Sequence, residues 1–213
     1  DAQNIRNKKF EQFHSDNTKQ SECFDTLDKL KETDIKYDVL MSGSDQVWNP
    51  VITDGLDSVF WGEVPGVSTR ISYAASIGME HYDEQTEAAA AKLIAALDYC
   101  SVREENTREY AEKISNREVK CVCDPVFLLP KYAYEPLIGK NPVKGKYLLL
   151  YSIVANDNML RIAEKYASEQ HLRLIEICAG VQRWHSHEQV VDIGPEGFLT
   201  YFYHADVIVT NSF

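Results

Sequence analysis

Short apolar runs alternate with longer amphipathic segments along most of this chain. Runs rich in β-branched and aromatic residues that stop at Gly, Pro, Asp or Ser predict strands. Segments with apolar residues one turn apart predict helices, most clearly in the alanine-rich stretch Gln85–Leu97. The predicted strands are the buried run from Tyr37 that breaks at Ser42, then Arg70–Ile77, Tyr99–Arg103, Val119–Cys123, Tyr147–Val154, Leu172–Cys178 and Val207–Thr210, and the predicted helices are Gln85–Leu97, Glu105–Ile114, Asp157–Glu169 and Pro195–His204.

Alternating strands and helices of this size indicate parallel β-α-β units with right-handed crossovers. Clustered Pro and Gly between residues 130 and 146 mark a linker. We therefore predict an α/β protein with two Rossmann-like halves, an N-terminal domain at 1–135, a linker at 136–146 and an incomplete C-terminal domain at 147–213. Residues 1–36 predict two short helices or a helix and a loop, and residues 51–66 and 179–192 predict loops.

Charge and cysteine content narrow the function classes. The formal net charge of −11 argues against nucleic acid or an anionic membrane as the main partner, while a few local cations still permit an anionic small substrate. The five cysteines are dispersed without a second paired set for zinc, which indicates a reducing cytoplasm, and Cys121 and Cys123 are expected as small core residues. No apolar run approaches the ~18 residues of a membrane span, so we predict a cytoplasmic protein that is not an integral membrane protein.

The polar loop after the first strand is the strongest candidate for chemistry. Ser42-Gly43-Ser44 ends an apolar run and is followed by Asp45, Gln46, Trp48 and Asn49. In open α/β sheets, ligands bind at such carboxyl ends of strands. Asp45 can act on protons and Trp48 offers a flat apolar wall. The alternative is a tight turn in which Asp45 caps local amides, because turns use the same residues.

Five stretches resemble, in the same order, those of the polysaccharide pyruvyl transferase family. The most specific is YDVLMSGSDQVWNP, from residue 37, and the resemblance extends to residue 213. The others are SYAASIG from residue 72, SVRE from residue 101, DPVFLL from residue 124, and GPEGFL from residue 194 followed by ADVIVTNSF.

The resemblance implies a GT-B-like pair of Rossmann-like domains and a bacterial-type, cytoplasmic transferase. The reaction would transfer a pyruvyl group from phosphoenolpyruvate, the donor substrate, and would need no cofactor. The acceptor would be two hydroxyls of a sugar or lipid-linked glycan that belongs to a cell-surface polysaccharide. The product is a cyclic ketal, and phosphate is released. Two other functions fit the same residues: a GT-B nucleotide-sugar glycosyltransferase, and a non-catalytic binding or assembly domain of glycan biosynthesis.

That chemistry requires a cation for the donor, a base for the hydroxyl and an acid for the enol carbon. We predict Asp45 as base or hydroxyl ligand and Arg103 as anion clamp, since Arg103 lies at the end of a predicted strand. The alternative for Arg103 is a salt bridge to Glu104, Glu105 or Asp124, and Asp124-Pro125 is expected to be a turn. The predicted substrate-binding residues are Ser44, Gln46, Trp48, Asn49, Tyr73, Ser76, Glu196, Asn211 and Ser212.

The last predictions concern a loop that carries three aromatic side chains and the two ends of the sequence. Trp184, His185 and His187 predict a surface loop, with an acceptor site as the second interpretation and a metal site as the last. Family members continue after a block like the one ending at Phe213 with a His-Gly pair, and that His is thought to be catalytic. They also begin with a strand that is absent before Asp1. We therefore expect both halves to be truncated and the fragment alone to be inactive.

Overall fold

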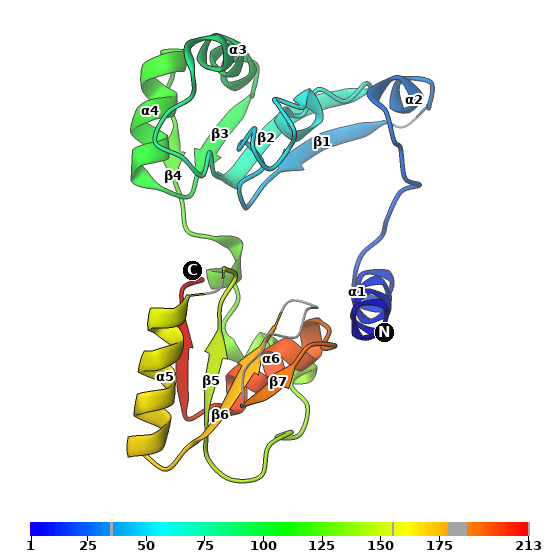
Figure 1. Cartoon of the computed structure of the whole chain (residues 1–213). Coiled ribbons are helices and arrows are strands. Elements are labelled where there is room, and N and C mark those ends of the chain that lie inside the picture. The colour runs from blue at the N-terminus through cyan, green and yellow to red at the C-terminus, as the bar shows by residue number, and fades with distance from the viewer. Residues whose placement is uncertain (35, 155, 179–186, 213) are drawn as a thin grey trace. The chain divides into compact units, whose positions relative to one another are not determined.

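The structure, a computed structural model, describes residues 1–34, 36–154, 156–178 and 187–212. The chain divides into two compact units (Figure 1). One comprises residues 22–130, and the other comprises residues 1–21 together with residues 131–213. The domain boundaries predicted from the sequence stay predictions.

The unit of residues 22–130 is built on a parallel four-stranded sheet, here sheet A. Its strands follow chain order across the sheet, β1-β2-β3-β4. When every crossover steps in one direction with right-handed geometry, the connecting helices lie on one face; α3 and α4 pack against each other beside this sheet (Figure 1). The elements are α2 (Leu27–Lys31), β1 (Tyr37–Ser42), η1 (Ser58–Trp61), β2 (Val67–Ala75), α3 (Glu84–Ala95), β3 (Tyr99–Val102), α4 (Glu105–Ser115), β4 (Lys120–Cys121) and η2 (Pro125–Phe127).

The helix-covered face of sheet A carries the core of this unit. Cys100 and Val102 of β3 are buried there with Ala90 and Ile94 of α3. Ala90 and Ile94 are the buried side chains of α3, and the predicted close packing of an alanine face on the sheet stays a prediction. The core extends under the loop after β1, where Trp48 is stacked on a second tryptophan.

The opposite face of sheet A is open in the described part of this unit. Met41, Ile71 and Tyr99 are register partners on three neighbouring strands, and the exposed fractions of Met41 and Tyr99 are 60% and 66%. The prediction of a buried first strand is therefore wrong. A continuous apolar run is typical of a parallel strand that is buried on both faces. Strand β1 has such a run, but it is an edge strand and only one of its faces is covered.

Sheet B lies in the other unit and is covered on both faces. Its parallel strands run in the order β7-β6-β5-β8, so the order reverses at β5. Leu148 and Leu150 pack on α5, whereas Tyr147 and Leu149 pack towards α6 (Figure 1). The elements are α1 (Ala2–Asn17), η3 (Lys131–Ala133), η4 (Glu135–Leu137), β5 (Tyr147–Tyr151), α5 (Asp157–Glu169), β6 (Arg173–Ile177), β7 (Glu188–Val190), α6 (Pro195–His204) and β8 (Val207–Thr210).

The two parallel sheets confirm an α/β protein with Rossmann-like halves, with three further local corrections. The helix α1 is sixteen residues long rather than short. Strand β7 lies within residues predicted as a polar loop, because three residues give too short a periodicity to detect. Cys121 and Cys123 are exposed rather than core residues, since β4 is a two-residue edge strand that ends at Cys121, before Cys123.

Candidate functional site

A glycine turn carries the chain from β1 to Asp45. Gly43 has φ of +122°, and a Cβ at this position would lie 2.1 Å from the carbonyl oxygen of Tyr73, so only glycine fits. Ser44 follows, half-buried. Asp45 has φ of +69°, and its carboxylate accepts a 2.8 Å hydrogen bond from the Gln46 amide. Local capping by Asp45, the alternative from sequence, is therefore present, yet its side chain is 84% exposed.

Asp45 and Arg103 lie on either side of Ala75 at the carboxyl edge of sheet A. Asp45 forms a parallel β-bridge with Ala75, and the Arg103 amide donates a 3.1 Å hydrogen bond to the Ala75 carbonyl. The side chains then approach each other, with 3.8 Å between Asp45 Oδ1 and Arg103 Nη2. The structure thus brings the two predicted catalytic residues together.

The Arg103 guanidinium is already paired with two further carboxylates. Its Nε donates to Glu104 at 2.7 Å and its Nη1 donates to Asp124 at 3.1 Å, while only 16% of the side chain is exposed. Desolvation lowers the pKa of Arg103, but Glu104 and Asp124 outweigh it and raise this pKa overall. The salt-bridge alternative is confirmed for these two residues. Three carboxylates, with Asp45, therefore surround one guanidinium.

Asp124 both pairs with Arg103 and caps the start of η2, whereas the sequence analysis predicted the salt bridge and the turn separately. One carboxylate oxygen pairs with Arg103, and the other accepts a 3.0 Å hydrogen bond from the Val126 amide at the start of η2. The turn predicted at Asp124-Pro125 is present. The same residue holds Arg103 in place, which becomes visible only when β3 and β4 lie side by side.

Gln46, Trp48 and Asn49 hold the loop together in this structure. The Asn49 amide donates a 2.8 Å hydrogen bond to the Gln46 side chain, which lies against Gly78. Trp48 is fully buried, with its ring centroid 4.2 Å from that of Trp61. A ligand would contact the Trp48 ring only if the ring left the core. The substrate-binding roles of these residues stay predictions.

Ser76 and Tyr73 lie on β2 or directly after it. Ser76 is 2% exposed, and its hydroxyl accepts a hydrogen bond from the Gly78 amide. Tyr73 is half-buried and its hydroxyl donates to the Cys123 carbonyl at 3.2 Å. Desolvation first, then Cys123 and Asp124, raise the pKa of Tyr73. Both side chains are thus engaged by the protein.

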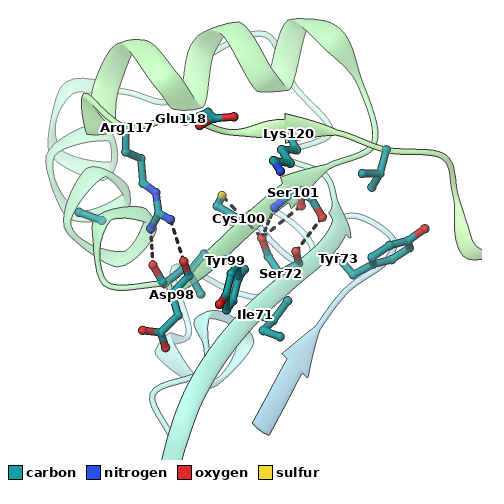
Figure 2. A pocket seen from close by; sticks show the side chains of 13 residues that line it. Ile71, Ser72, Tyr73, Asp98, Tyr99, Cys100, Ser101, Arg117, Glu118 and Lys120 are labelled. Carbon is teal, nitrogen blue, oxygen red and sulfur yellow. Dashed lines mark hydrogen bonds between the residues drawn. The ribbon is translucent and has the colours of Figure 1, made fainter.

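A hollow of about 810 Å³ lies on the sheet near Tyr73 (Figure 2). Tyr99, Ser101 and Lys120 line it, and Arg117 closes one end by donating to one carbonyl in the last turn of α3 and to one that follows the helix. The hydroxyls of Ser72 and Ser101, between the strands, form hydrogen bonds drawn in Figure 2. The sequence analysis gave neither serine a role, although each is the first residue of a stretch that resembles the pyruvyl transferase family.

The remaining predicted residues belong to the unit of sheet B. Glu196 is exposed in the first turn of α6. Asn211 is exposed and donates to the Val154 carbonyl at 3.4 Å, and the Ser212 amide donates to the Thr210 hydroxyl. A hollow of about 460 Å³ lies where β5 and β6 end and α6 begins, with Arg6 in its wall.

His187 corrects the prediction of a surface loop. Its side chain is 8% exposed, and its Nε2 lies 2.9 Å from Glu176 Oε2, a carboxylate that is itself buried in β6. Trp184 and His185 lie outside the described residues, so their predicted roles stay predictions. Eleven positions of the chain separate Glu176 from His187, so the buried pair forms only when β6 and the start of β7 are packed together.

One of three comparisons with known proteins gives a match, and it covers nearly the whole chain. A sequence model described as polysaccharide pyruvyl transferase matches residues 3–213. No curated protein and no solved structure matches the chain. In the part of the chain that the structure describes, no helix has the length and apolar character needed to span a bilayer. Family membership indicates a transferase of polysaccharide biosynthesis: the chain belongs to the polysaccharide pyruvyl transferase family.

Proposed function

We propose that this protein transfers a pyruvyl group from phosphoenolpyruvate to two hydroxyls of one sugar in a cell-surface polysaccharide. The observation that supports the proposal most directly is the approach of Asp45 to Arg103 at a strand edge of a family member. The proposal includes a cytoplasmic location, a GT-B-like plan and catalysis without a cofactor.

The reaction fixes what the site must do with protons. Each of two hydroxyl oxygens forms a bond to the central carbon of phosphoenolpyruvate, and the bond from that carbon to the phosphate oxygen breaks. One hydroxyl proton ends on the methylene carbon, which becomes a methyl group, and the other leaves with phosphate. A base near the acceptor hydroxyl is therefore needed, with an acid near the donor carbon.

Asp45 suits the role of base for an acceptor hydroxyl. Its carboxylate is exposed to an incoming ligand, while the Gln46 amide and the Arg103 guanidinium orient it from the protein side. Arg103 is held by Glu104 and Asp124 and cannot swing freely. We therefore assign Arg103 the task of fixing the direction and charge of Asp45.

The charge of this edge favours the acceptor over the donor. Glu104, Asp124 and Asp45 outnumber the one guanidinium that they surround. A phosphorylated carboxylate such as phosphoenolpyruvate would be repelled by that excess, whereas neutral hydroxyls can donate hydrogen bonds to it. We accordingly place the sugar at this edge, and the anion-clamp role first predicted for Arg103 becomes the secondary interpretation.

The test combines binding and turnover. Calorimetry with phosphoenolpyruvate is followed by phosphate release in the presence of methyl glycosides that carry two neighbouring free hydroxyls. We expect the full-length protein to bind phosphoenolpyruvate and to release phosphate when an acceptor is present. Absence of both from the full-length protein would overturn the proposal.

The same samples separate the two other functions, since a fold does not determine a reaction. A glycosyltransferase would be stabilised against heat by UDP, GDP or CMP sugars and not by phosphoenolpyruvate. A non-catalytic glycan-binding domain would bind the glycosides without releasing phosphate. Thermal shift with these ligands distinguishes the three outcomes.

A further inference from the structure

The register between β2 and β3 changes just before the candidate site. Ser72 pairs with Cys100, but Ala75 pairs with Val102. Three steps along β2 therefore match two steps along β3, which is a β-bulge of one extra residue. Ala74, inside the bulge, is fully buried and has φ of +53°.

Two serine hydroxyls replace the ladder hydrogen bonds that the bulge interrupts. The Ser101 amide donates to Ser72 Oγ at 3.0 Å, and Ser101 Oγ donates to the Ser72 carbonyl at 2.8 Å. Ser101 Oγ also accepts a 3.3 Å hydrogen bond from the Ala74 amide. Each strand thus reaches the backbone of the other through a side chain, as Figure 2 shows.

The bulge sets the position of the next residue, on which the site is built. Ala75 carries the bridge to Asp45 and accepts the hydrogen bond from the Arg103 amide. A one-residue slip in a strand exchanges the two faces of the sheet. Without the extra residue, the pairing of Ala75 would change, and Asp45 and Arg103 would no longer flank the same residue.

We propose that the paired hydroxyls of Ser72 and Ser101 are a positioning device for the candidate site: they hold the bulge that places Asp45 and Arg103 on either side of Ala75. Neither serine needs to touch a substrate. The structural part of this inference stands by itself, and its kinetic consequence rests on the proposed function.

Ser101→Ala is the direct test, with Ser101→Thr as the conservative variant that keeps the hydroxyl. Ser115→Ala is the matched control, because Ser115 also donates its hydroxyl to a backbone carbonyl of the same unit, within α4. We expect faster hydrogen exchange at the Ala74, Ser76 and Arg103 amides in Ser101→Ala only. If Ser101→Ala does not fold, the nearly isosteric Ser101→Cys, with its weak thiol donor, takes its place.

In the phosphate-release assay, Ser101→Ala should lower kcat on the order of 10²-fold with little change in KM, as expected for displaced reacting groups. Ser101→Thr should restore most of kcat. Unchanged exchange at all three amides would overturn the inference whatever the activity. Faster exchange in a protein whose wild type shows no turnover would leave the positioning role intact and count against the proposed function alone. Faster exchange with unchanged kcat would overturn the kinetic consequence.

Discussion

Asp45 Oδ1 lies 3.8 Å from Arg103 Nη2, although the two residues are 58 positions apart in the sequence. The contact exists because both backbones are hydrogen-bonded partners of the strand between them, through Ala75. The exposed carboxylate is therefore oriented by a guanidinium that is itself held by Glu104 and Asp124. Four predictions test this arrangement and the loop and helix that support it.

Replacing the proposed base should lower turnover without unfolding the protein. Asp45→Asn keeps the size and the tolerance for φ of +69°, but it cannot accept a proton. We expect phosphate release to fall roughly 10²–10⁴-fold. Asp54→Asn is the control, since Asp54 is also exposed with positive φ, at +53°. Equal rates for the two variants would remove Asp45 from the mechanism.

The two tasks of Asp124 can be separated by substitution. Asp124→Ala loses the amide cap, worth about 1 kcal/mol, and a charged hydrogen bond, worth about 1.5–3 kcal/mol, so the free energy of unfolding should fall by about 3 kcal/mol. Asp124→Asn retains the cap and should lose less. The control Asp57→Ala removes only a cap, at η1. Urea unfolding measures all three, and a loss in Asp124→Ala no larger than that in Asp57→Ala would contradict the role in holding Arg103.

The turn before Asp45 should tolerate no side chain. Gly43→Ala adds a methyl group where the Tyr73 carbonyl oxygen lies 2.1 Å away, in addition to the strain of φ at +122°. Gly55→Ala meets similar strain, at +106°, with no atom within 4 Å. We expect Gly55→Ala to cost roughly 1–2 kcal/mol and Gly43→Ala about 3 kcal/mol or more. Similar melting temperatures for both variants would mean that the turn relaxes easily.

The cap of α3 should make stability depend on pH. Hydrogen bonds from the Thr86 amide and hydroxyl lower the pKa of Asp83. A carboxylate with a lowered folded pKa stabilises the protein above its unfolded pKa of about 4, and this contribution is lost as the pH falls through the folded value. The difference in unfolding free energy between wild type and Asp83→Asn should therefore shrink on acidification from pH 6. A constant difference would show that the charge of Asp83 is not responsible.

Local pattern was sufficient for most of the elements. Helices α5 and α6 and strand β8 occur at the predicted residues, because their periodicity and end signals agree. The predictions that were wrong concern which side chains are buried and which segments pair with one another. The edge position of β1, the short β4 and the pair of His187 with Glu176 all depend on what lies alongside a segment, which no local window contains.

The sequence by itself determined the α/β class, the family, and the two residues proposed for the reaction, since strand ends with a Gly turn, Asp and Arg are local features. Tertiary structure decided the rest of the site. It showed that Arg103 is shared among three carboxylates, that Trp48 is a core residue, and that two serines form hydrogen bonds across the strands where the register changes. The physical reason is that charge balance, burial and register are properties of neighbouring strands, and neighbours are brought together only by folding.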